Sequence, residues 1–385
     1  MSKIKTLSLY LASIYFLQAT SVSFAQTNSP VQFTGSGFLT VAAGKVLSGN
    51  SHEEVSGYQC PCFISDYAQA GVYESGDVRY KPDSKLGLQG TMDITNTKLS
   101  FTGQAVARGA RDGKTDLEWL YGSYKLNNAA TLQLGRKRLP LFYYSESQDV
   151  GLSFPWIHLP PQLYGWEVVN YNGANLNYRT RLSDWEATLE LFGGAETKRD
   201  NEYWKIYNGK DSRTDSRWTN IIGTDLSLVH DWFETRLLYI QSDIQNTDPT
   251  ADNPREFSDP AKQKIYGISL NAELNDWVLR SEFLYMDRRP VNEEDYAQLY
   301  AVGYHLGKYF PMLSYTNYQM KNSPPDNETS EGHSTTSFVL RWDFSTSSDF
   351  KLQYDLWRDH SNPGYNLDTP YRNSRLLTVS YDMVF

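Results

Sequence analysis

Charged and aromatic side chains are concentrated between residues 136 and 164. Two arginines, Arg136 and Arg138, are followed by two acids, Glu146 and Asp149, and then by Trp156. Opposed positive and negative charges can select ions and orient dipolar solutes. The segment is also unusually apolar for a connection bathed in water, and its prolines stiffen it. These residue types predict recognition of solutes by charge and by packing.

The sequence shows no clustering of the residues that would be needed to catalyse hydrolysis. Hydrolysis needs a nucleophile, a base and an orienting group within hydrogen-bond reach. The chain has six histidines, and no serine lies in a nucleophile-elbow motif. His230 is predicted in a turn, and His52, His333 and His360 are predicted on outer loops, where a solvated role is the default. A barrel hydrolase is therefore the remote alternative, and no cofactor is expected.

The two cysteines, Cys60 and Cys62, flank Pro61. They could form a local disulfide in an oxidising compartment, or have no effect in either redox state. Two ligands cannot complete a zinc site by themselves. We therefore expect a structural loop here and no metal site.

In the elements that must hold these residues, apolar and polar side chains alternate with a period of two. In the last nine residues, Leu377 to Phe385, every second side chain is apolar or aromatic, and Thr378, Ser380 and Asp382 lie between them. Such a strand is apolar on one face and polar on the other. It suits a wall between lipid and water, and the same alternation recurs along the chain.

Seven short connections join such strands in pairs, and they consist of residues that tolerate tight turns. Five of them are followed at once by an aromatic residue, which predicts an aromatic belt at one membrane interface. With a first strand near residues 33–44 and the terminal strand, they predict sixteen strands, an even number that lets a barrel close. The turns are at residues 95–97, 127–128, 183–184, 230–231, 275–276, 307–308 and 345–348, and the aromatics are Trp185, Trp232, Trp277, Tyr309 and Phe350.

The complementary connections are long, and there are eight of them. Long loops at one end and short turns at the other are typical of transmembrane barrels. No repeat, linker or low-complexity tract indicates a second domain, so residues 26–385 are predicted to form one all-β domain. The long connections are predicted at residues 46–83, 108–115, 136–170, 195–217, 242–262, 287–296, 320–334 and 359–373.

Bulk composition agrees with a barrel and excludes helical membrane spans. After Gln26 no run of 18 apolar residues occurs, and the mean hydropathy is −0.55. A β-barrel hides its hydrophobicity from such averages because only alternate residues face lipid. Aromatic residues make up 14%, with 28 Tyr and 10 Trp, enough to supply interfacial girdles.

The first 25 residues have the pattern of a secretory signal peptide. Lys3 and Lys5 precede an apolar run over residues 7–17, and residues 23–25 offer a small-x-small cleavage site. The apolar run is too short to span a bilayer. We therefore expect export and cleavage near Ala25.

The chain resembles the Gram-negative outer-membrane porins over nearly its whole mature length. The resemblance rests on the opening strand over residues 35–41, the sixteen alternating segments and the terminal Phe385. It implies a homotrimer in contact with outer-membrane lipid and lipopolysaccharide, passive diffusion of small hydrophilic solutes, and no nucleic-acid partner. The alternative is a channel selective for a sugar, carboxylate or phosphate.

The resemblance also implies that the third long connection, residues 136–170, folds into the barrel and narrows the pore. Its composition also fits an aromatic flap at a subunit contact, or an ordered outer loop. Strand parity places a set of basic residues on the water side, where they could line the narrow zone or merely pair with acids. A register error of one residue would reverse each assignment, and the sign of ion selectivity stays open. The basic set is Arg179, Arg181, Arg236, Arg280 and Arg341.

Overall fold

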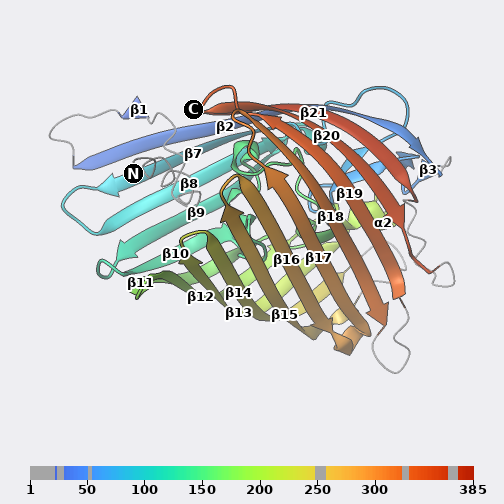
Figure 1. The fold of residues 1–385 in the computed structure, drawn as a ribbon. Coiled ribbons are helices and arrows are strands. Elements are labelled where there is room, and N and C mark those ends of the chain that lie inside the picture. The colour runs from blue at the N-terminus through green and yellow to red at the C-terminus, as the bar shows by residue number, and fades with distance from the viewer. Residues whose placement is uncertain (1–21, 24–29, 51–53, 248–256, 323–328, 363–371) are drawn as a thin grey trace.

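The computed structural model is a closed, antiparallel β-barrel (Figure 1). It describes residues 22–23, 30–50, 54–247, 257–322, 329–362 and 372–385. The predicted signal peptide, residues 1–25, lies outside the described residues except for Val22–Ser23, which form a two-residue strand, β1, against Thr34 and Gly35.

Sixteen strands of the described residues make up the wall, as predicted. Each pairs with its neighbours in sequence, and the ring closes because the first wall strand pairs with both the second and the last. The wall strands are β2 (Val31–Gly49), β7 (Lys85–Ile94), β8 (Leu99–Arg108), β9 (Thr115–Lys125), β10 (Ala130–Arg138), β11 (Asn170–Leu182), β12 (Trp185–Lys198), β13 (Asp215–His230), β14 (Phe233–Thr247), β15 (Phe257–Leu274), β16 (Trp277–Arg288), β17 (Glu293–Tyr304), β18 (Tyr309–Asn322), β19 (Thr329–Trp342), β20 (Ser348–Asp359) and β21 (Ser374–Val384).

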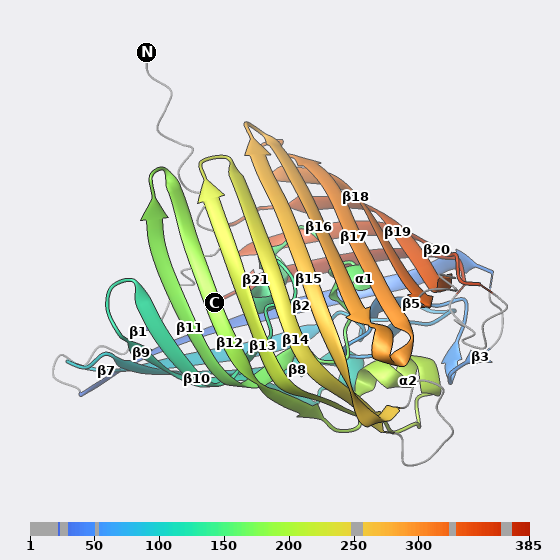
Figure 2. The same cartoon turned by 90° about the horizontal axis from the view of Figure 1, so that it is seen from below.

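The smaller elements all lie in the long connections. Figure 2 shows α1 inside the barrel and α2 at the end where the long connections gather. Among the described residues, no helix has the length and apolar character needed to cross a membrane. These elements are β3 (Glu54–Val55), β4 (Tyr58–Gln59), β5 (Phe63–Asp66), β6 (Gly71–Tyr73), α1 (Pro161–Tyr164), α2 (Glu202–Asn208) and the 3-10 turns η1 (Gly109–Arg111), η2 (Ser145–Ser147), η3 (Gly151–Ser153) and η4 (Arg289–Val291).

The period of two puts apolar side chains on the outside of the wall. In β21, Leu377 and Val379 are exposed on the outer face, while Thr378 between them is fully buried. A wall whose outer face is apolar is stable only in contact with lipid or another apolar surface.

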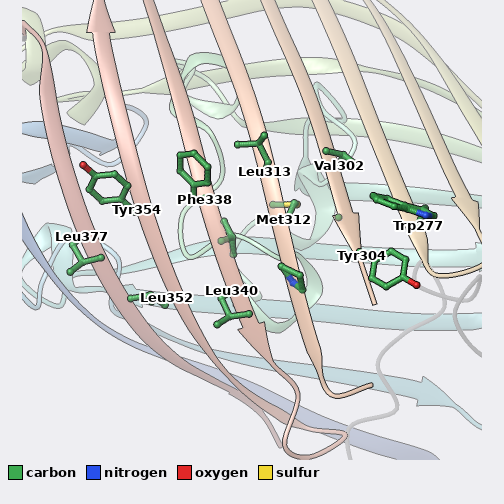
Figure 3. Close-up of a pocket in the computed structure, with 13 residues that line it drawn as sticks. Trp277, Val302, Tyr304, Met312, Leu313, Phe338, Leu340, Leu352, Tyr354 and Leu377 are labelled. Atoms are coloured by element: carbon green, nitrogen blue, oxygen red, sulfur yellow. The ribbon is translucent and has the colours of Figure 1, made fainter. Parts of the chain in front are cut away.

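A shallow outer groove of ≈ 400 Å³ illustrates this apolar character (Figure 3). Among the residues that line it are Gly303, Pro311, Leu313, Phe338 and Leu340. The last three side chains are 42–49% exposed, which in water would be costly. The groove therefore belongs to the lipid-facing surface that the alternation predicts.

All seven predicted short turns are present. Five of them use a residue with positive φ: Gly307, with φ of 63°, and Asn96, Ser183, Asp231 and Asn275, with φ between 48° and 61°. Asn and Asp tolerate this left-handed conformation better than other residues with a side chain. The predicted aromatics lie at these turns, and they form ring contacts with neighbouring strands, such as Trp277 with Tyr304.

Several long connections are shorter than predicted, because the strands continue into their polar ends. The predicted loop at 287–296 shrinks to residues 289–292, and that at 195–217 shrinks to residues 199–214. The prediction places these charged strand ends in the long connections. In the structure alternate residues of these ends face the interior, as Asp295 shows by accepting a hydrogen bond of 2.7 Å from Tyr318.

Candidate functional site inside the barrel

The connection between β10 and β11, residues 139–169, is here called the inner loop. It contains η2, η3 and α1, and most of its residues are buried. Its side chains and backbone contact inward-facing residues of strands from β8 round to β21, so it crosses the interior of the ring (Figure 2). Four groups of contacts fix its position.

The first group is a buried charge cluster near the start of the inner loop. Asp149 of the loop contacts Arg108 at 2.7 Å and is also paired with Arg138. Glu118 lies 2.7 Å from Arg108 and 3.1 Å from Arg138. All four residues are at most 6% exposed. Burial acts to raise the pKa of Asp149, but the two guanidinium groups lower it well below its ordinary value, so the loop is held by an ionised carboxylate.

The second group joins basic residues of the wall to loop carbonyls. Lys351 donates hydrogen bonds to the carbonyls of Gly151 and Trp156 at 2.6 and 3.0 Å. Arg341 donates to the carbonyls of Leu152 and Phe154 at 3.0 and 3.3 Å. Buried carbonyls need such donors. These cations therefore satisfy the backbone of the inner loop.

The third group is centred on His158. Its Nδ1 lies 3.0 Å from Asp83 and its Nε2 lies 3.2 Å from Asp355 of β20. Asp83, which precedes β7, also accepts a hydrogen bond from Tyr73 at 2.8 Å. Burial alone would lower the pKa of His158, but the two carboxylates outweigh it and raise the pKa to about 10. A histidinium thus joins the inner loop to the first long connection and to the wall.

The fourth group is apolar. Inward-facing side chains of β14 to β18 pack against the inner loop and are here called the covered wall. The outward neighbour Leu237 is 44% exposed, whereas Leu238 and Ile240 on the inner face are at most 5% exposed. The covered wall comprises Leu238, Ile240, Ile244, Ile265, Leu284, Met286, Leu299, Met312 and Met320, and the loop contributes Leu139, Leu141, Phe142, Phe154, Trp156 and Leu163.

The covered wall was missed by the sequence analysis, although the sequence carries a signal for it. Residues 237–240 of β14 are apolar or aromatic without interruption. A strand that is apolar on both faces is buried on both. The predicted site residue Trp156 ends in this core, is fully buried, and donates a hydrogen bond of 3.0 Å to Ser314.

A second apolar cluster lies at the long-loop end. Tyr67 of the first long connection stacks on Tyr207 of α2 at 6.0 Å and on His333 of β19 at 5.9 Å, and His333 stacks on Trp357 at 4.6 Å. The prediction of a solvated His333 on an outer loop is wrong, because β19 extends to Thr329 and carries the ring into this stack. Cys60 and Cys62 are joined as a disulfide in the same cluster.

The interior opposite the covered wall is polar and more accessible. A set of polar, inward-facing side chains of β7 to β12 is half-buried and is here called the open wall, while others on these strands, such as Gln104 and Glu118, are buried. Their outward neighbours, such as Leu88, Leu120 and Leu134, are 56–58% exposed on the outer surface. The open wall comprises Gln89, Thr91, Tyr121, Ser123, Gln133, Asn177, Thr188 and Glu190.

One predicted acid of the inner loop faces this accessible side. The side chain of Glu146 is 55% exposed, and it lies 3.8 Å from the ammonium group of Lys137. Lys137 itself donates a hydrogen bond of 2.6 Å to Gln133. Lys137 is not among the residues predicted to line the pore, although it lies between Arg136 and Arg138, which are.

The other predicted residues are dispersed. The guanidinium of Arg136 contacts Glu196 at 2.7 Å, whereas Arg138 joins Glu118 and Asp149, so the two arginines belong to different groups of contacts. Arg181, at a short turn, lies 2.6 Å from Glu186.

The remaining three are on the inner side. Arg179 is exposed there, at the short-turn end of β11. Arg236 pairs with Asp225 and donates to the carbonyl of Pro140. Arg280 lies 2.5 Å from Glu273. Within the described ranges, no group of three or more His, Cys, Asp or Glu side chains is arranged to hold a metal ion.

Comparison with known proteins shows which solved structures share this fold. No family model and no curated protein sequence matches the chain. Among solved structures, OmpF of Salmonella typhi in complex with daunomycin has a TM-score of 0.58 at 11% identity, covering 92% of this chain and 98% of that chain. The chain has the fold of the sixteen-stranded outer-membrane porins.

Two further porin-like structures agree with this assignment. The anion-selective porin from Comamonas acidovorans has a TM-score of 0.57 at 12% identity and covers 92% of this chain and 100% of that chain. The outer membrane channel DcaP of Acinetobacter baumannii has a TM-score of 0.57 at 8% identity and covers 94% and 99%. At these identities the comparison shows that the porin fold is shared. It assigns no role to the residues that line the interior of this barrel.

Proposed function

We propose that this protein is an outer-membrane porin, which lets small hydrophilic solutes and ions diffuse passively through a water-filled channel. The observation that carries the proposal is a closed sixteen-stranded wall that is apolar outside and, along the open wall, polar and accessible inside. A closed barrel satisfies its backbone hydrogen bonds internally, which is the condition for spanning a lipid bilayer with strands.

The inner loop is the constriction of the proposed channel. It fills the space beside the covered wall, so solutes would pass between the loop and the open wall. Of the predicted site residues, Glu146 lines this passage, and Arg179 lies at its short-turn end. Arg138, Asp149, Arg236 and Arg341 hold the loop in place.

Location and assembly follow from the same proposal. Residues 1–25 direct export, the short turns face the periplasm, and the aromatic belt contacts lipid at that interface. Lipopolysaccharide surrounds the long-loop end. We place three copies side by side, because β2 and β8 present small outward residues, Gly35, Ala43, Gly103 and Ala105, that let another barrel approach closely. One similar structure, OmpT of Vibrio cholerae, is described as a trimer form.

A substrate-selective channel is the second candidate. It is favoured by the one-sided interior, because a solute confined against the open wall would meet the same few side chains on each passage. Catalysis has less support, because His158 is enclosed by Asp83 and Asp355 in a buried tether. The protein therefore acts without turnover or cofactor in this proposal.

Conductance in a planar lipid bilayer tests the proposal directly. Purified protein should give large ohmic steps, in groups of three for a trimer, and the reversal potential under a salt gradient should report the sign of ion selectivity. Folded barrel that gives no conductance would overturn the channel. Small steps that one solute class blocks would favour the selective channel.

A further inference from the structure

We propose that the open wall is a binding surface for small uncharged polyhydroxyl solutes, such as monosaccharides. This inference rests on the proposed function and narrows it to a substrate class. Three features of the wall carry it: the type of its side chains, the pairing of its charges, and its position opposite the inner loop.

The first feature is a ladder of neutral hydrogen-bonding groups. Gln104 donates to Gln89 at 3.0 Å, and the hydroxyls of Thr91 and Thr102 lie 3.1 Å apart. One strand pair further on, Gln133 donates to Ser123 at 3.4 Å. Amides and hydroxyls each offer both donors and acceptors, which is what a sugar hydroxyl requires. A solute with many hydroxyls can exchange its water for these groups at little cost.

The second feature is that the charges beside this ladder, on Glu190, Lys137 and Glu146, are already compensated, while the exposed cation Arg179 lies apart, at the short-turn end of β11. The carboxylate of Glu190 accepts hydrogen bonds from Asn175 at 3.0 Å and from Asn177 at 2.7 Å. Lys137 is shared between Gln133 and Glu146. An anionic solute would have to displace these contacts, and it would meet Glu146 and Glu190. The wall therefore disfavours carboxylates and phosphates.

The third feature is geometric. The inner loop is fixed to the covered wall by its apolar core and by Lys351, Arg341 and His158, so it cannot retreat easily. A solute that passes on the other side is held between the loop and the open wall. Polar groups placed on a rigid scaffold bind with a smaller ordering cost than groups on a mobile one.

The test is block of ion current in a planar bilayer by glucose, with glucuronate as a probe of similar size that carries a carboxylate. Glucose should reduce the current in a saturating manner, and glucuronate should require at least a tenfold higher concentration. The variants Asn177→Leu and Gln133→Leu should each raise the half-blocking concentration of glucose about fivefold, from loss of one or two hydrogen bonds. Gln298→Leu, the same change on the outward face of β17, is the matched control and should leave block unchanged.

Each outcome decides the matter. Glucuronate that blocks as well as glucose would overturn the inference, as would Asn177→Leu and Gln133→Leu channels that conduct and bind glucose like the parent. Saturable glucose block that both variants weaken and Gln298→Leu does not would support it. The open-channel current before any sugar is added tests the proposed function by itself: without that current the porin proposal fails, whereas a normal current without glucose block removes only the present inference.

Discussion

The two sides of the barrel interior are built from the same alternating strands, yet one holds a loop and the other is accessible. The covered wall presents Leu, Ile and Met side chains, which form one core with the inner loop and lie among buried polar residues such as Ser242, Ser269 and Glu282. The side chains that make up the open wall are amides, hydroxyls and one carboxylate, and they stay half-buried. Because the outer faces of both sides are apolar, the difference lies in the inward residues alone.

This difference explains how a loop can divide a polar interior without a second domain. Burying an apolar loop surface against an apolar wall contributes about 25 cal/mol for each Å² removed from water. The charged contacts of the loop fix where it lies but contribute little to the free energy of unfolding, because the attraction in a buried ion pair roughly offsets the cost of desolvating its charges. Packing therefore holds the loop on one side, and the ionic tethers set where each part of it lies.

The largest effect is expected from removing the central aromatic of that packing. Trp156→Ala should lower the free energy of unfolding by about 4 kcal/mol, because it leaves a large cavity and an unpaired Ser314. It should also increase conductance and current noise as the loop loosens. Urea unfolding in detergent micelles and single-channel recording measure both. Trp277→Ala, at an outer position 52% exposed, is the control, and an equal loss in both variants would contradict packing as the main anchor.

A somewhat smaller loss is expected from the charge cluster. Asp149→Asn leaves Arg108 and Arg138 short of a buried counter-charge, so the free energy of unfolding should fall by about 3 kcal/mol. Glu186→Gln removes a carboxylate from the exposed pair with Arg181 and should cost less than about 1 kcal/mol. The same urea titration compares them. Similar small losses in both would mean that water reaches the cluster and screens it.

The tether at His158 predicts a dependence on pH. Its pKa is raised from 6.5 to about 10 in the folded protein, so its stabilising contribution is complete below pH 6.5 and is lost as the pH rises towards 10. Over that window the unfolding free energy should fall with a slope approaching one proton. His158→Gln should remove this slope, and His230→Gln, in a turn, should retain it. A parent protein whose unfolding free energy is flat from pH 6.5 to 10 would contradict a charged tether.

The fold was predictable from the sequence because it depends on a repeated pattern. Sixteen strands and seven turns follow from the period of two and from residues such as Asn96 and Asn275, which allow tight turns. The interior was less predictable because parity says which face a residue is on, and not what lies opposite. Arg236 and Arg341 face inward as expected, but loop carbonyls accept their hydrogen bonds. The prediction of the strand ends was wrong for a related reason. Asp295 is polar and was predicted in a loop, but in the structure it lies on the inner face of β17.

The smallest expected effect concerns the pair of charges between the two sides, of which Glu146 is exposed and Lys137 is buried. Glu146 and Lys137 lie 3.8 Å apart at the edge of the open wall, and the Glu146 side chain is 55% exposed. Charges near the narrow zone of a pore bias the ions that enter it. Because water and salt screen the exposed Glu146, Glu146→Gln should shift the permeability ratio towards anions by only about twofold. Lys137→Met should shift it by a similar factor towards cations. Reversal potentials under a salt gradient measure both, and shifts of the same sign in the two variants would show that the passage does not run beside this pair.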